Sequence, residues 1–254
     1  MKHLSSSSVV ARALLFILLL VPALQGCAAI ATQKSKRAPM VTPTAASSPQ
    51  AASSPATDDG VDRETSEPYE GDLSIFEDAQ RDQKLHIERV MDVLGIREGS
   101  GVADIGAGSG WFTVRAARRA GSGGTVYAVE INREYLKHIE ERAASEKLSN
   151  VRAVLGKEDD PLLPEKSVDA VLILKTYHEI AEPVRLLTRL RRSLRAGARV
   201  GVIDRNGKGD DHGIARELVI KEAERAGYTL AEEHDFVKDD GMDYFLVFRV
   251  RGDK

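Results

Sequence analysis

Residues 102–113 read VADIGAGSGWFT, an apolar run followed by glycines at three alternate positions. An amphipathic stretch follows directly, with apolar residues at positions 114, 116, 117 and 120. This pattern predicts a buried strand, a tight turn and a helix. Glycines let the backbone approach a ligand closely, and the start of a helix offers free N–H groups to an anion. The stretch is therefore a candidate site for a nucleotide-like ligand, although a glycine turn also occurs in α/β domains that bind nothing there.

An acidic residue marks the end of the next predicted strand. Residues 125–129 read TVYAV and are followed by Glu130, Ile131 and Asn132. A carboxylate in this place can accept hydrogen bonds from both hydroxyls of a ribose, and its charge repels a 2′-phosphate. Asn132 is predicted to cap a helix that runs to about residue 146. The glycine turn and the acidic strand end together are a stronger signal than either alone.

Strands and helices continue to alternate along the chain. We expect strands at 151–155, 168–174 and 200–204, helices at 181–194 and 214–226, and a closing hairpin-like pair of strands at 228–236 and 244–250. Gly197 is predicted to stop the helix at 181–194.

Two loops of this pattern carry polar residues to the carboxyl ends of predicted parallel strands, where ligands bind in open α/β sheets. The loop after 151–155 reads GKEDD, and its Glu158 or Asp159 could contact an adenine amino group or could simply be solvated. The strand at 168–174 leads into KTYHE at 175–179.

A helix is also expected ahead of the first strand. Apolar residues between Ser74 and Leu94 fall at helical spacing, and Gly95 follows as a stop signal. Phe76 and the pair Arg81–Asp82 precede the periodic part. This segment could cover a ligand cleft or could be a plain N-terminal cap, and the sequence favours neither.

The first seventy residues differ from the rest of the chain. Lys2 and Arg12 precede an apolar run from Ala13 to Leu24, which is short for a membrane span and has the shape of a secretory signal. The run ends in LQGC at 24–27, which resembles the lipobox of bacterial lipoproteins, in which the cysteine is diacylated and becomes the mature N-terminus. Cys27 is the only cysteine, so no internal disulfide can form. The alternative is an ordinary signal helix that happens to contain a cysteine.

We therefore expect a lipoprotein signal peptide at 1–26, a flexible tether rich in Ala, Ser and Pro at 27–70, and one globular domain at 71–254. Two acyl chains suffice for stable membrane anchoring. The resemblance implies a bacterial envelope protein that is anchored to the membrane through acylated Cys27 and faces the periplasm. Ala28, next to the cysteine, favours the outer over the inner membrane. Initiation at Met40 would instead give a cytosolic protein.

Composition and charge exclude some functions. With 254 residues, 42% of them hydrophobic, and a net charge of −3, the chain can bury one full core but offers no strongly basic surface for nucleic acid. The arginines at 185, 189, 191, 192 and 195 are interpreted as a solvated helix face. The histidines and carboxylates are not spaced as metal ligands, so no metal site is predicted. The oligomeric state cannot be read from this sequence.

The set of motifs resembles class I S-adenosylmethionine-dependent methyltransferases over nearly all of the globular part. Gly106, Gly108 and Gly110 form G-x-G-x-G, whereas a nicotinamide dinucleotide fingerprint requires its third glycine where Trp111 stands. The stretches VYAVEIN, LLPEKSVDAVLI and LRAGARVGVID resemble the family at the corresponding strands. The resemblance implies an α/β Rossmann-like three-layer sandwich around a seven-stranded sheet of order 3-2-1-4-5-7-6, with strand seven antiparallel.

The resemblance also implies a cofactor, S-adenosylmethionine, and residues that hold it. Asp104 would be oriented toward the ammonium of the methionine part, Glu130 toward the ribose hydroxyls and Ile131 toward the adenine. The cofactor-binding residues implied in this way are Asp104, Gly106, Ala107, Gly108, Gly110, Glu130, Ile131, Glu158 and Asp159. The chain departs from many relatives at Lys157, where they carry Asp, which puts the adenine contact in doubt. It also lacks the Asn-Pro-Pro-aromatic motif, which argues against amino and amide nitrogens as methyl acceptors.

The candidate catalytic residues lie in the segment KTYHEI, which resembles a bacterial subgroup of such proteins with Tyr-His-Glu after strand four. A methyl sulfonium carries an activated leaving group, so the protein mainly aligns the acceptor and excludes water. If a base is used, His178 is the candidate, with Tyr177 orienting the substrate and Glu179 orienting the imidazole. His178 could equally be a surface or capping residue. His212 and His234 are interpreted as structural.

The functional hypothesis is methyl transfer from S-adenosylmethionine to a small molecule or an envelope component by a lipid-anchored domain. Its difficulty is that the cofactor is made in the cytosol. The alternative is an exported, non-catalytic module of the same fold that binds a nucleoside or acts as a scaffold. A nicotinamide-dependent oxidoreductase is disfavoured by the glycine spacing.

Overall fold

The computed structural model describes residues 65–208, 212–238 and 241–253. The predicted signal peptide, Cys27, and the tether up to residue 64 lie outside the described residues. Within the described ranges, no helix combines the length and the apolar character needed to cross a membrane.

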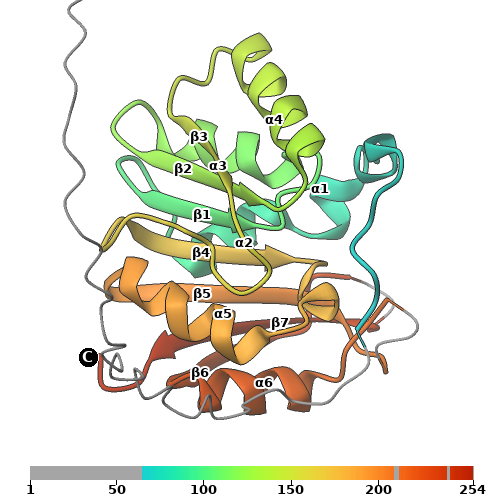
Figure 1. Ribbon diagram of the computed structural model, residues 1–254, viewed down its shortest axis with the longest axis vertical. Coiled ribbons are helices and arrows are strands. Elements are labelled where there is room, and N and C mark those ends of the chain that lie inside the picture. Colours follow the sequence, from blue (N-terminus) through green and yellow to red (C-terminus); the bar gives the residue numbers. More distant parts are fainter. Residues whose placement is uncertain (1–64, 209–211, 239–240, 254) are drawn as a thin grey trace, which may run out of the picture. The chain divides into compact units, whose positions relative to one another are not determined.

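The domain is built on one seven-stranded sheet of order β3-β2-β1-β4-β5-β7-β6 (Figure 1). β7 runs antiparallel to its neighbours β5 and β6, and the other pairs are parallel. This order confirms the topology that the sequence resemblance implied. The strands are β1 (Gly101–Ile105), β2 (Thr125–Glu130), β3 (Val151–Leu155), β4 (Val168–Leu174), β5 (Leu194–Arg205), β6 (Tyr228–His234) and β7 (Asp243–Val250).

Helices cover both faces of the sheet, as Figure 1 shows for α5 and α6 in front of it. The apolar side chains of α2 and α3 pack on one face, where α4 also lies, and those of α5 and α6 pack on the other. The α-helices are α1 (Arg81–Lys84), α2 (Ile87–Leu94), α3 (Trp111–Ala120), α4 (Arg133–Ser145), α5 (Pro183–Leu190) and α6 (Arg216–Arg225). The 3-10 helices are η1 (Leu73–Phe76), η2 (Tyr177–Glu179) and η3 (Arg191–Ser193).

The central strands are apolar because both of their faces are covered. In β1, Val102 joins the apolar layer under α2 and α3, while Ala103 and Ile105 point to the opposite face and join the layer under α5 and α6. All five residues of β1 are buried. Since β1, β2, β3, β4 and β5 are parallel, the residues that follow them gather at one edge of the sheet.

Asn132 begins α4 as predicted. Its side chain accepts hydrogen bonds from the backbone N–H groups of Glu134 and Tyr135, which satisfies donors that a helix start leaves free. The helix fixes the direction in which the chain leaves the end of β2.

Predicted boundaries were wrong in two regions, ahead of β1 and between α5 and β5, where β5 begins at Leu194 and not at residue 200. The expected helix from Ser74 to Leu94 is interrupted at His86, whose left-handed backbone (φ 47°) separates α1 from α2 and whose ring packs edge-on against Phe236. Gly197 does not stop a helix: α5 ends at Leu190, and Gly197 lies within β5 with a positive φ of 76°. A glycine with a positive φ can end a helix but can also lie within a strand, so the presence of Gly197 in the sequence did not distinguish the two.

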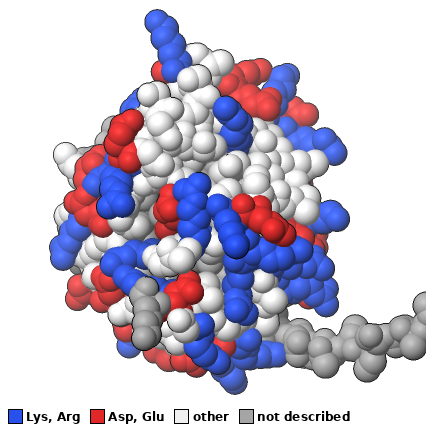
Figure 2. Space-filling view, turned by 90° about the vertical axis from the view of Figure 1, so that its left-hand side faces the viewer, with Lys and Arg blue, Asp and Glu red and all other residues white. Residues whose placement is uncertain are grey.

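The arginines near the end of α5 are balanced by acidic neighbours. Figure 2 shows Lys and Arg interspersed with Asp and Glu over the side of the molecule that it presents. Arg189 pairs with Asp159 at 2.6 Å, and Arg195 pairs with Asp169 at 2.6 Å. Paired, exposed charges of this kind stabilise little.

Candidate functional site

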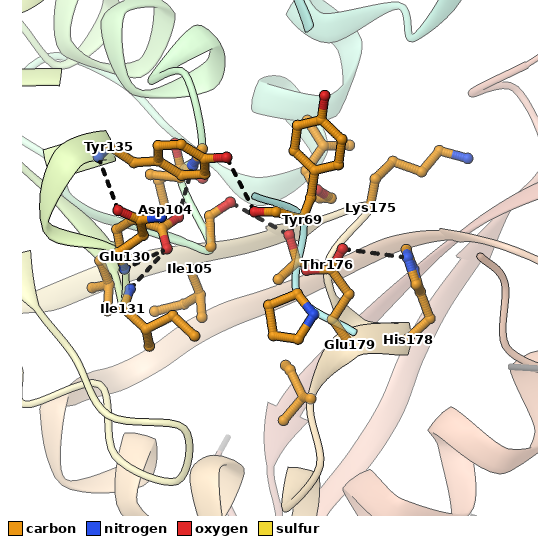
Figure 3. Close-up of a pocket in the computed structure, with 18 of the residues that line it drawn as sticks. Tyr69, Asp104, Ile105, Glu130, Ile131, Tyr135, Lys175, Thr176, His178 and Glu179 are labelled. Carbon is orange, nitrogen blue, oxygen red and sulfur yellow. Dashed lines mark hydrogen bonds and ion pairs between the residues drawn. The ribbon is translucent and has the colours of Figure 1, made fainter. Parts of the chain in front are cut away.

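A pocket of about 750 Å³ opens at the carboxyl edge of the parallel strands (Figure 3). Its wall includes the glycine turn after β1, the end of β2, the loop after β3 and the loop after β4. The chain segment 65–70 closes one side. The volume lies in the range of small-molecule and cofactor sites.

The glycines of the turn have different tasks. Gly106 adopts a positive φ of 70°, and a Cβ there would collide with the side chain of Thr176. Gly108 has open space in front of it, and a Cβ would come no closer than 3.9 Å to Phe76. Gly110 does not line the pocket; a Cβ there would approach Ile139 of α4 to 3.1 Å. Gly106 and Gly108, with Ala107 between them, shape the pocket, while Gly110 seats the start of α3.

The carboxylate of Glu130 is held by the backbone on both of its oxygens. Oε2 accepts the N–H of Gly108 at 3.0 Å, and Oε1 accepts the N–H groups of Ile131 at 2.8 Å and Asn132 at 3.2 Å. A carboxylate has about four acceptor positions, so Glu130 keeps capacity for a ligand hydroxyl. Ile131 is 42% exposed and lines the pocket beside it.

Asp104 lies at the floor of the pocket and is 2% exposed. Burial raises the pKa of this carboxyl to about 7, although the hydrogen bond from the Thr113 hydroxyl and the positive charge of Arg81 act in the opposite direction. A cationic partner stabilises the charged form of such a buried carboxylate.

The N-terminal part of the domain covers the pocket. Phe76 and Arg81 line it, which supports the cleft-covering interpretation of this segment over that of a plain cap. The Tyr135 hydroxyl donates to the carbonyls of Tyr69 and Gly71, both at 3.1 Å. The Tyr69 ring meets Phe76 edge-on at 5.3 Å. Residues 65–70, which the sequence assigned to the tether, thus pack against the domain.

After β4, the short helix η2 directs His178 to the pocket and Tyr177 away from it. Tyr177 has no exposed surface and belongs to the core under α5, so the structure does not support its predicted contact with a substrate. A single 3-10 turn sends adjacent side chains in different directions, and the sequence did not indicate which one would face inward.

His178 is held by Asp204 at the end of β5. The imidazole Nδ1 lies 2.9 Å from Asp204 Oδ1, and the His178 backbone N–H donates to Oδ2 at 3.1 Å. His178 is 4% exposed and Asp204 is 0% exposed. With Nδ1–H directed at the carboxylate, Nε2 is the nitrogen that can accept a proton.

The orienting role predicted for Glu179 therefore belongs to Asp204. A Glu179 oxygen lies 3.8 Å from Nε2, on the other side of the ring, as Figure 3 shows. Burial raises the pKa of Glu179 to about 7, and the charge of His178 opposes that rise. Asp204 was missed, although its place at the end of a strand predicted to lie beside β4 was a usable signal.

The remaining candidates divide between the pocket and its surroundings. Glu158 and Lys157 line the pocket, whereas Asp159 turns to α5 and pairs with Arg189. His212, interpreted as structural, lines the pocket with its ring 5.9 Å from that of His178. His234 packs between Phe236 and Phe245. Across the described ranges, no group of three or more His, Cys, Asp or Glu side chains could hold a metal ion.

Comparison with known proteins places this geometry in context. Residues 102–197 match the family described as Methyltransferase domain. The chain is 31% identical over 114 residues to Nocamycin O-methyltransferase from Saccharothrix syringae. The aligned region covers 45% of this chain and 41% of that protein. The chain spans less than half the length of the curated relatives it matches.

Solved structures share the fold. A SAM-dependent methyltransferase from Aquifex aeolicus aligns with a TM-score of 0.64 at 24% identity, covering 71% of this chain and all of that one. The [4+2]-cyclase SpnF aligns with a TM-score of 0.57 at 15% identity, covering 76% of this chain and 88% of that one. Residues 102–197 thus match a methyltransferase domain, and the whole sheet has the class I fold of S-adenosylmethionine-dependent methyltransferases.

Proposed function

We propose that this chain binds S-adenosylmethionine and transfers its methyl group to a small molecule. The observation that carries the proposal is Glu130, a carboxylate fixed by the Gly108 backbone at the end of β2 with acceptor capacity directed to the pocket. The match of residues 102–197 to a methyltransferase domain supports the same conclusion.

The residues of the pocket fit this cofactor in charge and shape. Glu130 would accept the ribose hydroxyls, Ile131 would lie against the adenine, and Glu158 would accept from its amino group. The buried carboxylate of Asp104 would pair with the ammonium of the methionine part, and the open space in front of Gly108 leaves room for the methionine chain.

Bound S-adenosylmethionine would supply a methyl group attached to a sulfonium, and loss of this methyl group leaves a neutral thioether. The protein then has to align the acceptor with that methyl and exclude water. For a hydroxyl acceptor, His178 Nε2 takes the proton as the bond to carbon forms, and Asp204 stabilises the resulting imidazolium through Nδ1–H. Leu174, Ile180 and Leu186 line the pocket and suit an acceptor with an apolar body.

We also propose that the enzyme works in the cell envelope, anchored through acylated Cys27. The support is the sequence alone: a signal-like apolar run, LQGC at 24–27 and a tether rich in Ala, Ser and Pro. An acceptor at or near the membrane then comes within reach of the domain.

A second candidate is a different reaction, or binding alone, on the same fold. It is favoured by one comparison, the [4+2]-cyclase SpnF, which shares the fold. Fold does not fix chemistry, so the cofactor titration below decides first.

We expect the full chain to bind S-adenosylmethionine with a Kd on the order of 1 µM, about −8 kcal/mol, and not to bind NAD. Glu130→Ala should weaken S-adenosylmethionine binding by about 10- to 100-fold, because it removes charge-assisted hydrogen bonds to the ribose. Isothermal titration calorimetry measures both affinities. Glu134→Ala, on the exposed side of α4, is the matched control. Equal affinity in wild type and Glu130→Ala would remove the ribose assignment, and no binding by wild type would remove the proposed function.

Cofactor affinity should fall as the pH drops below 7. Because the pKa of Asp104 is raised to about 7, the free protein takes up a proton there in acid, and that proton must leave before the ammonium pairs with the carboxylate. The loss should approach about tenfold per pH unit between pH 7 and 5.5.

Calorimetry of two variants over this pH range assigns the effect. Asp104→Asn keeps an oxygen for the Thr113 hydroxyl and should bind weakly with a flat profile. Glu179→Gln removes the other carboxyl with a pKa of about 7 and should keep the slope. A sloping Asp104→Asn profile would contradict the assignment.

His178→Ala and Asp204→Asn should each lower kcat by about 10²- to 10⁴-fold, as expected for loss of a general base or of its orientation. Their affinity for S-adenosylmethionine should stay within about twofold of wild type. The assay is transfer of a radiolabelled methyl group to a hydroxyl acceptor selected by screening, with His234→Ala as control. Unchanged kcat in His178→Ala would assign His178 a structural role.

The native protein, isolated from bacterial membranes, should begin at a diacylated Cys27. Intact-mass and peptide mass spectrometry of its N-terminus measures this. A native chain that begins at Met40, or a soluble chain cleaved after residue 26 without lipid, would contradict the proposed anchoring.

A further inference from the structure

Arg81 lies at the pocket wall, and within the described part of the chain it forms no ion pair. Its guanidinium lies over the Trp111 ring, 4.4 Å from the centroid, and Nη1 donates to the Phe76 carbonyl at 2.8 Å. Among the described residues, no carboxylate oxygen lies within 4.0 Å of its nitrogens. The side chain is half-buried and lines the pocket.

The acidic residues around Arg81 are held by other groups. Glu77 pairs with Arg142 at 2.6 Å, and Asp82 pairs with Arg115 at 2.6 Å. Asp104 accepts the Thr113 hydroxyl at 2.6 Å. Lys175, another cation of the pocket wall, is already neutralised by Asp243 at 2.5 Å. Among the described residues the Arg81 side chain donates only to the Phe76 carbonyl, so this partly desolvated guanidinium keeps N–H donors for a carboxylate that arrives with a ligand.

The position of Arg81 identifies which part of a ligand it meets. Arg81 donates to the backbone carbonyl of Phe76. The Phe76 ring is the group nearest to the open space in front of Gly108. Arg81 lies over Trp111, which directly follows the glycine turn, and Asp104 lies just ahead of that turn, so both line the glycine-turn end of the pocket. One cation and one carboxylate at the same end match the carboxylate and ammonium of an α-amino acid.

We propose that Arg81 is the carboxylate-binding residue of this pocket: it receives the α-carboxylate of the methionine part while Asp104 receives the ammonium. The inference rests on the proposed function. This assignment gives α1 a role in recognition, because Arg81 supplies the charge that distinguishes a nucleoside with an amino acid attached from one without it.

A pair of ligands tests the assignment by calorimetry on the full chain. S-adenosylhomocysteine carries the amino acid, whereas 5′-methylthioadenosine keeps the nucleoside and sulfur but lacks it. Arg81→Ala should weaken S-adenosylhomocysteine binding by about 10- to 100-fold, and 5′-methylthioadenosine binding by less than about twofold. Arg81→Lys should recover part of the loss as a point charge.

Arg115→Ala is the matched control. Arg115 lies over the same Trp111 ring at 4.0 Å but pairs with Asp82 and does not line the pocket. It should leave both affinities near wild type. Binding of 5′-methylthioadenosine also reports that Arg81→Ala is folded.

Other outcomes overturn the assignment in distinguishable ways. Equal losses for both ligands in Arg81→Ala would make Arg81 a structural residue, and no loss for either would remove it from the site. Both of these results leave the nucleoside site, and hence the proposed function, standing. Failure of the wild type to bind either ligand would overturn the proposed function and the role of Arg81 together.

Discussion

Three carboxylates are buried where parallel strands end, and the site depends on how each one is satisfied. Burying a carboxylate is costly unless donors compensate it. Backbone N–H groups compensate Glu130 after β2, the Thr113 hydroxyl compensates Asp104 at β1, and the backbone and ring of His178 compensate Asp204 at the end of β5. These hydrogen bonds tie the glycine turn to β2 and the loop after β4 to β5. The pocket is thereby rigid at the points where a ligand's charges and hydroxyls would meet it.

Local sequence predicted the alternation of strands and helices, the resemblance to class I methyltransferases implied the sheet order, and short motifs located part of the site. The glycine turn and Glu130 are read from short patterns, because each depends on the strand, turn and helix immediately around it. Asp204 and Arg81 could not be found in this way, because tertiary structure brings each of them to its partner. The pairing of β4 with β5 places Asp204 beside His178. The break at His86 separates α1 from α2, and Arg81 of α1 lies over the Trp111 ring of α3. The predicted substrate contact of Tyr177 was not supported for a related reason, because a single 3-10 turn determines which of two adjacent side chains enters the core.

The pocket divides into two chemically different halves. Asp104, Glu130 and Arg81 give the half at the glycine turn its charges, and these match a ligand that carries both signs. The half beyond β4 combines the apolar side chains of Leu174, Ile180 and Leu186 with the imidazoles of His178 and His212, of which His178 is held by Asp204. This half suits an acceptor with an apolar body that loses a proton. The residues of the first half would hold the cofactor, and His178 in the second half would take a proton from the acceptor.

His178 is fixed by three hydrogen-bonding contacts, and one of them comes from residues 65–70. The Asp204 carboxylate binds the imidazole Nδ1 and the backbone N–H of His178. The backbone carbonyl of His178 accepts the N–H of Ser66 at 3.2 Å. A base held in this way loses little freedom when the acceptor arrives, so less of the barrier is spent on orientation. Ser66 belongs to residues 65–70, the end of the predicted tether, which the structure shows packed against the domain. The segment that leads from the proposed membrane anchor is therefore part of the support of the proposed base, and it shapes the acceptor half of the pocket as well as closing it.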